Sequence, residues 1–146
     1  MKHFKLEEFK CRCGCTIPEE AKANLTALIE QVLDPAREKL GRPIFVNSGY
    51  RCLKHNQKVG GATNSQHTKG EAADIIASST NRHQNYLLGR LIASLGNFDQ
   101  IIFEDTGRQD LLPEWIHVSW KRNGNNRHSQ LIAQRVNGKT TYISAN

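Results

Sequence analysis

Two short stretches of the chain carry residues that could do chemistry together. In residues 65–74 an imidazole, His67, stands seven positions before a carboxylate, Asp74. Further along, Glu114-Trp-Ile-His117 supplies a second imidazole and a second carboxylate. Two imidazoles and one carboxylate are a ligand set that a catalytic zinc ion accepts while its fourth position stays open. We therefore expect His67, Asp74 and His117 to bind Zn²⁺, and Glu114 to remain free to transfer protons.

The geometry of the first stretch depends on a turn. Residues 72–77 are small or branched, which predicts a buried strand. A carboxylate inside such a strand costs several kcal/mol unless it is paired or bound to a metal, which favours a ligand role for Asp74. A lone histidine is more often an ordinary surface or core residue, and a fully extended chain would place His67 about 23 Å from Asp74. We expect Gly70 and the loop before it to fold His67 back over the start of the strand.

The second stretch predicts a strand with two distinct faces. In residues 115–120 apolar and polar side chains alternate, so that His117 shares one face with Trp115 and Ser119. Taken alone, His117 could be a half-exposed cross-strand residue. Glu114 stands three positions earlier and would point to the opposite side of an ideal strand. Because Pro113 precedes it, we expect Glu114 to lie in a loop or a twisted strand start, from which it reaches the same metal.

Two helices are predicted around these residues. Thr16 and Glu19 make a capping box, and apolar residues then recur at three- and four-residue steps up to Gly41, which predicts a long helix. Pro35 should kink this helix near its end. A second helix is predicted over residues 82–95, with a glycine directly after it.

Strands account for most of the remaining pattern. Asn137-Gly138 is the strongest hairpin signal in the chain. Two helices and a run of later strands predict a single α+β domain over residues 1–146, with a small antiparallel sheet and helices packed on one side. Besides residues 72–77 and 115–120, the predicted strands are residues 43–47, 98–103, 131–136 and 140–143.

Composition narrows the classes of function. No apolar run approaches the ~20 residues that a membrane helix needs, and residues 1–8 lack the apolar stretch of a signal peptide. We therefore expect synthesis in the cytoplasm, unless a leader was trimmed. The net charge of +6 either solubilises the surface or attracts a polyanion such as a cell wall. No strong nucleic-acid-binding motif is present, and we expect a monomer that binds no nucleic acid.

Four cysteines form an unusual pattern. Cys11, Cys13 and Cys15 alternate with single residues, and Cys52 follows much later. This spacing lacks the two-residue gap of common zinc knuckles. Cys52 could join the cluster as a fourth metal ligand or as a disulfide partner, or all four thiols could be free, the default without a secretion signal.

Three motifs together resemble the M15 family of zinc D-Ala-D-Ala carboxypeptidases and murein endopeptidases. They are Ser48-Gly-Tyr-Arg51, Ser65-x-His67-x-x-Gly70-x-Ala72-x-Asp74 and Glu114-x-x-His117. The resemblance spans about residues 4–120 and implies the compact α+β fold shared with the signalling domain of hedgehog proteins. It also implies roles for six side chains, namely zinc ligands at His67, Asp74 and His117, a general base at Glu114, a substrate-orienting Arg51, and Ser65 as a donor beside the metal. It explains neither the cysteine cluster nor the Asn137-Gly138 hairpin.

The resemblance further implies a substrate and a place of action. The substrate would be a peptidoglycan peptide that contains D-residues, and the enzyme could be a phage or prophage lysis protein that waits in the cytoplasm and acts at the cell wall. Arg51 has a planar fork of donors that could hold a substrate carbonyl or carboxylate there. Two other classes stay open. One is a zinc-bound module of the same fold without catalysis, and the other is a nucleic-acid-binding domain with zinc in the cysteine cluster.

Overall fold

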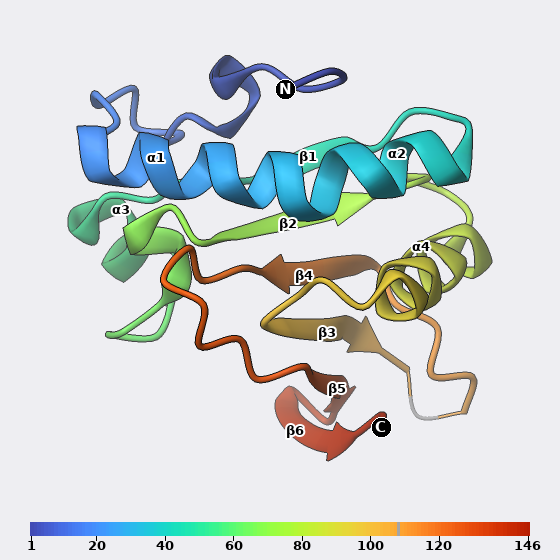
Figure 1. Ribbon diagram of the computed structural model, residues 1–146. Coiled ribbons are helices and arrows are strands. Elements are labelled where there is room, and N and C mark those ends of the chain that lie inside the picture. Colours follow the sequence, from blue (N-terminus) through green and yellow to red (C-terminus); the bar gives the residue numbers. More distant parts are fainter. Residues whose placement is uncertain (108) are drawn as a thin grey trace.

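A six-stranded sheet forms the centre of the computed structural model, which describes residues 1–107 and 109–146 (Figure 1). Its strand order is β1-β2-β4-β3-β5-β6. Neighbouring strands are antiparallel, apart from β3 and β5, which are parallel. The strands are β1 (Phe45–Ser48), β2 (Ala72–Ile76), β3 (Gln100–Thr106), β4 (Trp115–Ser119), β5 (Ser129–Val136) and β6 (Lys139–Ser144). The α+β class is thus confirmed, and the predicted antiparallel sheet gains one parallel pair because residues 120–128 carry the chain from β4 past β3.

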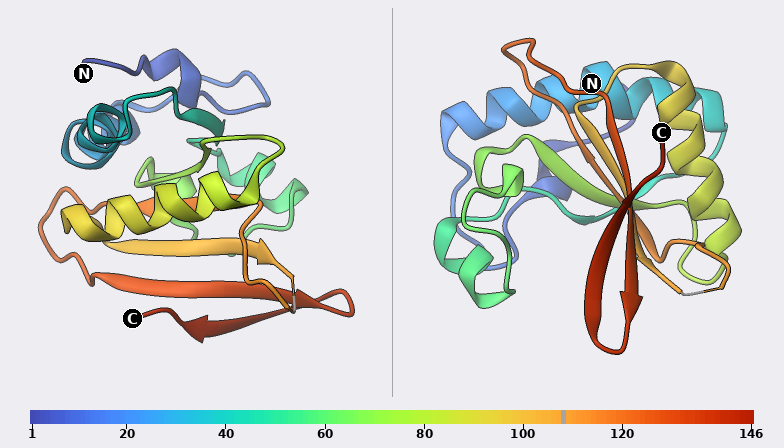
Figure 2. Two further views of the ribbon diagram at one scale, coloured as in Figure 1. Left: turned by 90° about the vertical axis from the view of Figure 1, so that its right-hand side faces the viewer. Right: turned by 90° about the horizontal axis from the view of Figure 1, so that it is seen from below.

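The main helices cover one side of this sheet (Figure 2). α1 (Glu19–Leu28), the π-helical η2 (Ile29–Leu33) and α2 (Asp34–Leu40) follow one another as a single rod, and α4 (Arg82–Leu95) packs beside α2. α1 begins at Glu19 after Pro18 and has no side-chain cap, so the predicted capping box at Thr16 does not form. Among residues 1–107 and 109–146, no helix is long and apolar enough to cross a membrane.

A π-helical turn accommodates Pro35 within the rod. A proline has no N–H to donate to the carbonyl four residues earlier, which here belongs to Gln31. Residues 29–33 widen into η2 just before Pro35, and the Gln31 carbonyl accepts a hydrogen bond of 3.5 Å from the Asn97 amide. The predicted disturbance at Pro35 therefore takes the form of a local π-helical segment.

Strand alternation divides the sheet into an apolar face and a polar face. On the apolar face, six side chains from the three central strands are at most 2% exposed and join one core cluster with the helices. These are Ala73 and Ile75 of β2, Ile101 and Phe103 of β3, and Ile116 and Val118 of β4. Burying an aliphatic or aromatic side chain of this size stabilises a fold by about 1.5–3 kcal/mol. The alternate residues of the same strands necessarily project from the other face.

Three short helical segments lie near β1 and β2. They are η1 (Leu6–Phe9), α3 (Leu53–Lys58) and η3 (Gln66–Lys69). η3 contacts both α1 and β2, which brings residues 66–69 beside the polar face of the sheet. At the far edge, Asn137 and Gly138 both have positive φ and form the predicted tight hairpin between β5 and β6.

Candidate metal centre and cleft

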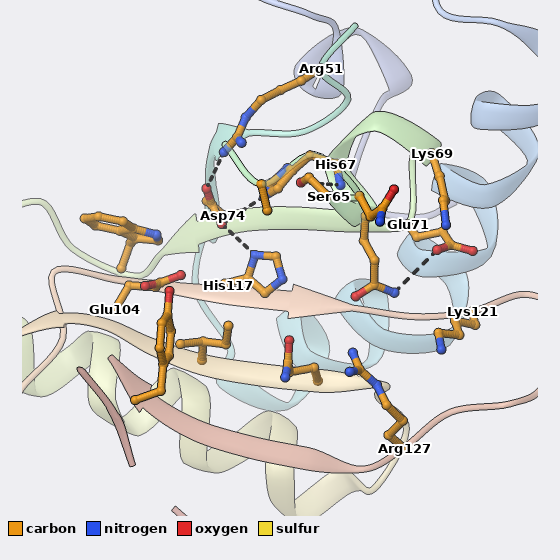
Figure 3. A pocket seen from close by; sticks show the side chains of 17 residues that line it. Arg51, Ser65, His67, Lys69, Glu71, Asp74, Glu104, His117, Lys121 and Arg127 are labelled. Atoms are coloured by element: carbon orange, nitrogen blue, oxygen red, sulfur yellow. Dashed lines mark hydrogen bonds and ion pairs between the residues drawn. The ribbon is translucent and has the colours of Figure 1, made fainter. Parts of the chain in front are cut away.

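His67, Asp74 and His117 converge on the polar face of the sheet (Figure 3). Asp74 Oδ1 lies 3.3 Å from His67 Nε2 and 3.1 Å from His117 Nδ1. In a tetrahedral zinc site with bond lengths of about 2.0–2.2 Å, neighbouring ligand atoms are about 3.4 Å apart. The three ligand atoms are therefore already spaced to hold one zinc ion.

Pairing between β2 and β4 places two of these ligands. Asp74 and His117 are directly opposite one another in the antiparallel register, and their side chains project to the same face. His67 comes from η3, whose first turn is capped by Ser65 Oγ, the acceptor of a 3.2 Å hydrogen bond from the His67 N–H. Gly70 ends η3 at φ +75°, and a Cβ there would collide with the backbone of Ala21. The Ser65-to-Asp74 motif thus builds the turn that the sequence predicts.

A hydrogen bond on the side of the ring away from Asp74 fixes the orientation of His67. Its Nδ1 donates a 2.7 Å hydrogen bond to the Gly49 carbonyl, which leaves Nε2 facing Asp74. Such a partner sets the tautomer of a metal-binding histidine and raises its basicity. Gly49 in turn packs against Phe9, and a Cβ at this position would lie 2.6 Å from the Phe9 backbone. The N-terminal arm therefore helps to position a candidate ligand.

Arg51 holds the other oxygen of Asp74. Its Nη2 donates to Asp74 Oδ2 at 3.3 Å, and its remaining nitrogens bond Ser48 Oγ and Asn56 Oδ1, both at 3.1 Å. Burial opposes ionisation of Asp74, but the charges and hydrogen bonds of the two imidazoles outweigh it, and the pKa of this carboxyl falls well below its usual range. Asp74 is therefore an ionised candidate ligand whose Oδ1 faces the two imidazoles.

Glu114 does not join this cluster. It precedes β4 by one residue and projects toward the helix face, as Ile116 and Val118 do. There its carboxylate pairs with Arg82 Nε of α4 at 3.3 Å, and its carbonyl accepts a hydrogen bond from Asn85. Glu114 does lie in a bend before β4, as expected after Pro113, but this bend does not turn its side chain to the polar face. The geometry therefore does not support Glu114 as the base.

Glu104 is a carboxylate that lines the same cleft as the three candidate ligands. β3 continues to Thr106, so Glu104 is opposite Trp115 and shares the polar face with Ile102, the partner of His117. Burial, reinforced by the nearby negative charge of Asp74, raises the pKa of Glu104 to about 7. A carboxyl whose pKa lies near neutrality can both accept and return a proton under ordinary conditions.

Sequence reasoning missed Glu104 because it ended the strand at Phe103. The alternation of side chains along a strand could have identified Glu104. If the strand over residues 98–103 is extended and paired with the His117 strand, then the residue two beyond Ile102 must face the same side. Pairing with β4 on one side and β5 on the other extends β3 beyond its apolar run.

These residues line one open cleft with a volume of about 510 Å³. The lining includes Arg51, Glu104 and Tyr142, the last contributed by β6 of the hairpin. At one end the lining is mainly basic, with Lys69, Lys121 and Arg127 beside Glu71 (Figure 3).

Asp99 holds residues at the basic end of the cleft in place through hydrogen bonds. Its fully buried carboxylate accepts two side-chain hydrogen bonds from Arg127, at 3.1 and 2.8 Å, and one from Gln66 of η3 at 3.1 Å. Burial opposes its ionisation, but the hydrogen bonds and charge of Arg127 outweigh that effect and lower the pKa of Asp99 to about 2. This network ties η3, and with it His67, to β3 and the start of β5.

Comparison with known proteins identifies the family of the chain. The family model of peptidase M15 matches residues 2–107, so the chain belongs to the peptidase M15 family. A stretch of 61 residues, 40% of the chain, is 44% identical to the zinc D-Ala-D-Ala carboxypeptidase of Streptomyces albus G. That stretch covers 24% of the relative's length, so the chain matches about a quarter of the relative.

Proposed function

We propose that this protein is a zinc-dependent peptidase that hydrolyses peptide bonds in bacterial cell-wall peptidoglycan. Three metal ligands and one proton-transferring carboxylate that share a single cleft carry this proposal. Membership of the peptidase M15 family and the likeness to a zinc carboxypeptidase support both the cofactor and the reaction class. The metal is zinc, held by His67, Asp74 and His117.

The chemistry divides between the metal and the chain. Zinc bound by these ligands polarises a carbonyl group and lowers the pKa of a water molecule from about 15.7 toward about 7. Glu104 accepts the proton of the attacking water and then delivers it to the nitrogen of the leaving amine. The cleavage consumes one water and yields a carboxylic acid and an amine, so the carboxylate of Glu104 is regenerated in each turnover.

Arg51 and Ser65 support this step in different ways. Arg51 is fixed by three hydrogen bonds at the wall of the cleft, where its positive charge can stabilise the negative charge that develops on the substrate carbonyl oxygen. It also keeps Asp74 Oδ1 directed at the metal. Ser65 caps η3 and so positions the His67 ligand, and its place in the lining of the cleft also allows a contact with substrate.

The substrate class is proposed from the relative and from charge. The Streptomyces relative is named for D-Ala-D-Ala. A net charge of +6 favours association with an anionic wall. The basic end of the cleft suits a carboxylate of the substrate, whether a free C-terminus, as in a carboxypeptidase substrate, or an acidic side chain within a longer peptide, as for an endopeptidase. We propose that the protein acts at the cell wall.

Digestion of purified peptidoglycan with the zinc-loaded protein tests the proposal. Mass spectrometry of the soluble products should show new fragments, and their masses identify the bond. Release of single D-alanine indicates a carboxypeptidase, whereas cleaved cross-links or stems indicate an endopeptidase. If wall material and D-Ala-D-Ala peptides stay intact while the protein carries zinc, the chain is a non-catalytic zinc-binding module instead.

A further inference from the structure

A second group of candidate ligands lies outside the cleft. The sulfur atoms of Cys11, Cys13, Cys15 and Cys52 all lie within 4.8 Å of one another. Cys11 Sγ is 3.2 Å from Cys13 Sγ and 3.8 Å from Cys52 Sγ, and Cys13 and Cys52 are 3.6 Å apart. Residues separated by about forty positions in sequence thus meet at one point.

The spacing of these sulfurs matches a metal site better than a disulfide. A disulfide requires two sulfurs at about 2.05 Å, and the four cysteines are free thiols. Zinc–sulfur bonds are about 2.3 Å long, so in a tetrahedral site neighbouring sulfurs are about 3.8 Å apart. The three distances above lie within about 0.6 Å of that value.

The backbone is shaped around this point. Gly14 has φ +83° and donates a 2.9 Å hydrogen bond to the Cys11 carbonyl, which bends residues 11–15 into a tight turn. Cys52 caps the first turn of α3, where its Sγ accepts from the His55 N–H at 3.4 Å. Cys11 Sγ accepts from the Cys52 N–H, also at 3.4 Å. Backbone donors directed at sulfur stabilise thiolates, the form in which cysteine binds a metal.

We propose that the four cysteines bind a second, structural zinc ion. Four thiolates fill a tetrahedral shell, so such an ion has no open position for catalysis. Zn²⁺ replaces the thiol protons, which pass to solvent as the site forms. The ion would cross-link the N-terminal arm to the start of α3, immediately beside Arg51. The same region also carries the Tyr50 N–H bond to the Phe9 carbonyl at 2.8 Å, so the site would stabilise the segment that holds both Arg51 and Gly49.

Metal stoichiometry after reconstitution with Zn²⁺ and a reductant tests this proposal without reference to peptidase activity. Elemental analysis should find two zinc ions in the wild type. His67→Ala should retain one, which belongs to the cysteines, and the double variant Cys13→Ser/Cys15→Ser should retain the other. Cys13 is exposed and Cys15 is partly buried at the edge of the core, so serine, which is close to cysteine in size, disturbs the packing little. The single variant Cys13→His, which keeps a zinc ligand at position 13, should bind two zinc ions like the wild type.

Two measurements on the wild type guard against a folding artefact in the variants. Cobalt loading should give the intense visible absorption of a tetrahedral thiolate site, and a thiol reagent should react with the four cysteines only after a chelator is added. A single zinc ion in the wild type that His67→Ala loses, or rapid reaction of all four thiols in the zinc-loaded protein, would overturn the proposal. A protein mass lower by two or four units, which indicates one or two disulfides, would also overturn it, as would the colour of bound iron. None of these results bears on the zinc in the cleft.

Discussion

Replacing Glu104 by glutamine separates the two candidate bases. The amide keeps the size and most contacts of the carboxyl but cannot accept a proton at neutral pH. Glu104 lines the cleft beside the metal ligands and has a pKa of about 7, whereas Glu114 is on the opposite face, paired with Arg82. Glu104→Gln should therefore abolish most turnover, and Glu114→Gln serves as the matched control.

The magnitude follows from the role assigned to each residue. General acid–base catalysis contributes roughly 10²- to 10⁴-fold to a rate, so kcat/KM of Glu104→Gln should fall by that factor, a loss of about 3–5 kcal/mol of transition-state stabilisation. Glu114→Gln removes only the ion pair between a half-exposed carboxylate and Arg82, which is worth about 0–1 kcal/mol of stability. The kcat/KM of Glu114→Gln should therefore stay within about twofold of the wild-type value.

The assay follows the release of products from a D-Ala-D-Ala peptide or soluble peptidoglycan fragment by mass spectrometry at fixed zinc. Both variants should bind zinc like the wild type, because neither residue is a ligand, and a metal assay checks this. The assignment fails if Glu104→Gln keeps wild-type turnover, or if Glu114→Gln loses turnover while its zinc content and fold are intact.

Three further predictions concern the surroundings of the site. A Cβ at Gly61 would collide with Asn56, which holds Arg51, so Gly61→Ala should lower kcat/KM about tenfold or more, whereas Gly107→Ala, where the nearest atom is 3.6 Å away, should not. Ser65→Ala removes the cap of η3 and should lower the free energy of unfolding by about 1 kcal/mol and weaken zinc binding, as urea unfolding and metal titration would show. In zinc-free protein the pKa of Glu104 in the folded state, about 7, exceeds its ordinary value of 4.5. Its contribution to stability is therefore present below pH 4.5 and lost as the pH rises through 7, and comparison of urea unfolding with Glu104→Gln at pH 5 and pH 8 would reveal it.

The approach of His67 to Asp74 could be predicted from sequence because the local surroundings of these two residues are unusual. Asp74 is a charge within a small, apolar strand, and the turn that returns His67 to it needs Gly70. The hairpin at Asn137-Gly138 was likewise predictable from two residues that tolerate positive φ. In each case the information lies within about ten residues of sequence.

The base and the cysteine cluster depend instead on contacts between distant segments. Glu114 stands three positions before His117, so strand alternation alone puts it on the opposite face, and only the packing of residues 111–114 against α4 shows that the chain keeps this alternation. β3 extends to Glu104 only because β4 and β5 pair with it on both sides. Cys52 reaches Cys11 because η1 contacts β1, a contact that the spacing of the cysteines does not contain.

Anomalous diffraction at the zinc edge from crystals grown with Zn²⁺ would test the central claim most directly. An anomalous peak should mark a zinc ion that His67 Nε2, Asp74 Oδ1 and His117 Nδ1 bind at about 2.0–2.2 Å. The Glu104 carboxylate should face the open position of this ion, and Glu114 should lie on the far side of the sheet. Zinc-loaded crystals with no peak among these three side chains, or with Glu114 turned into the cleft in place of Glu104, would contradict the account.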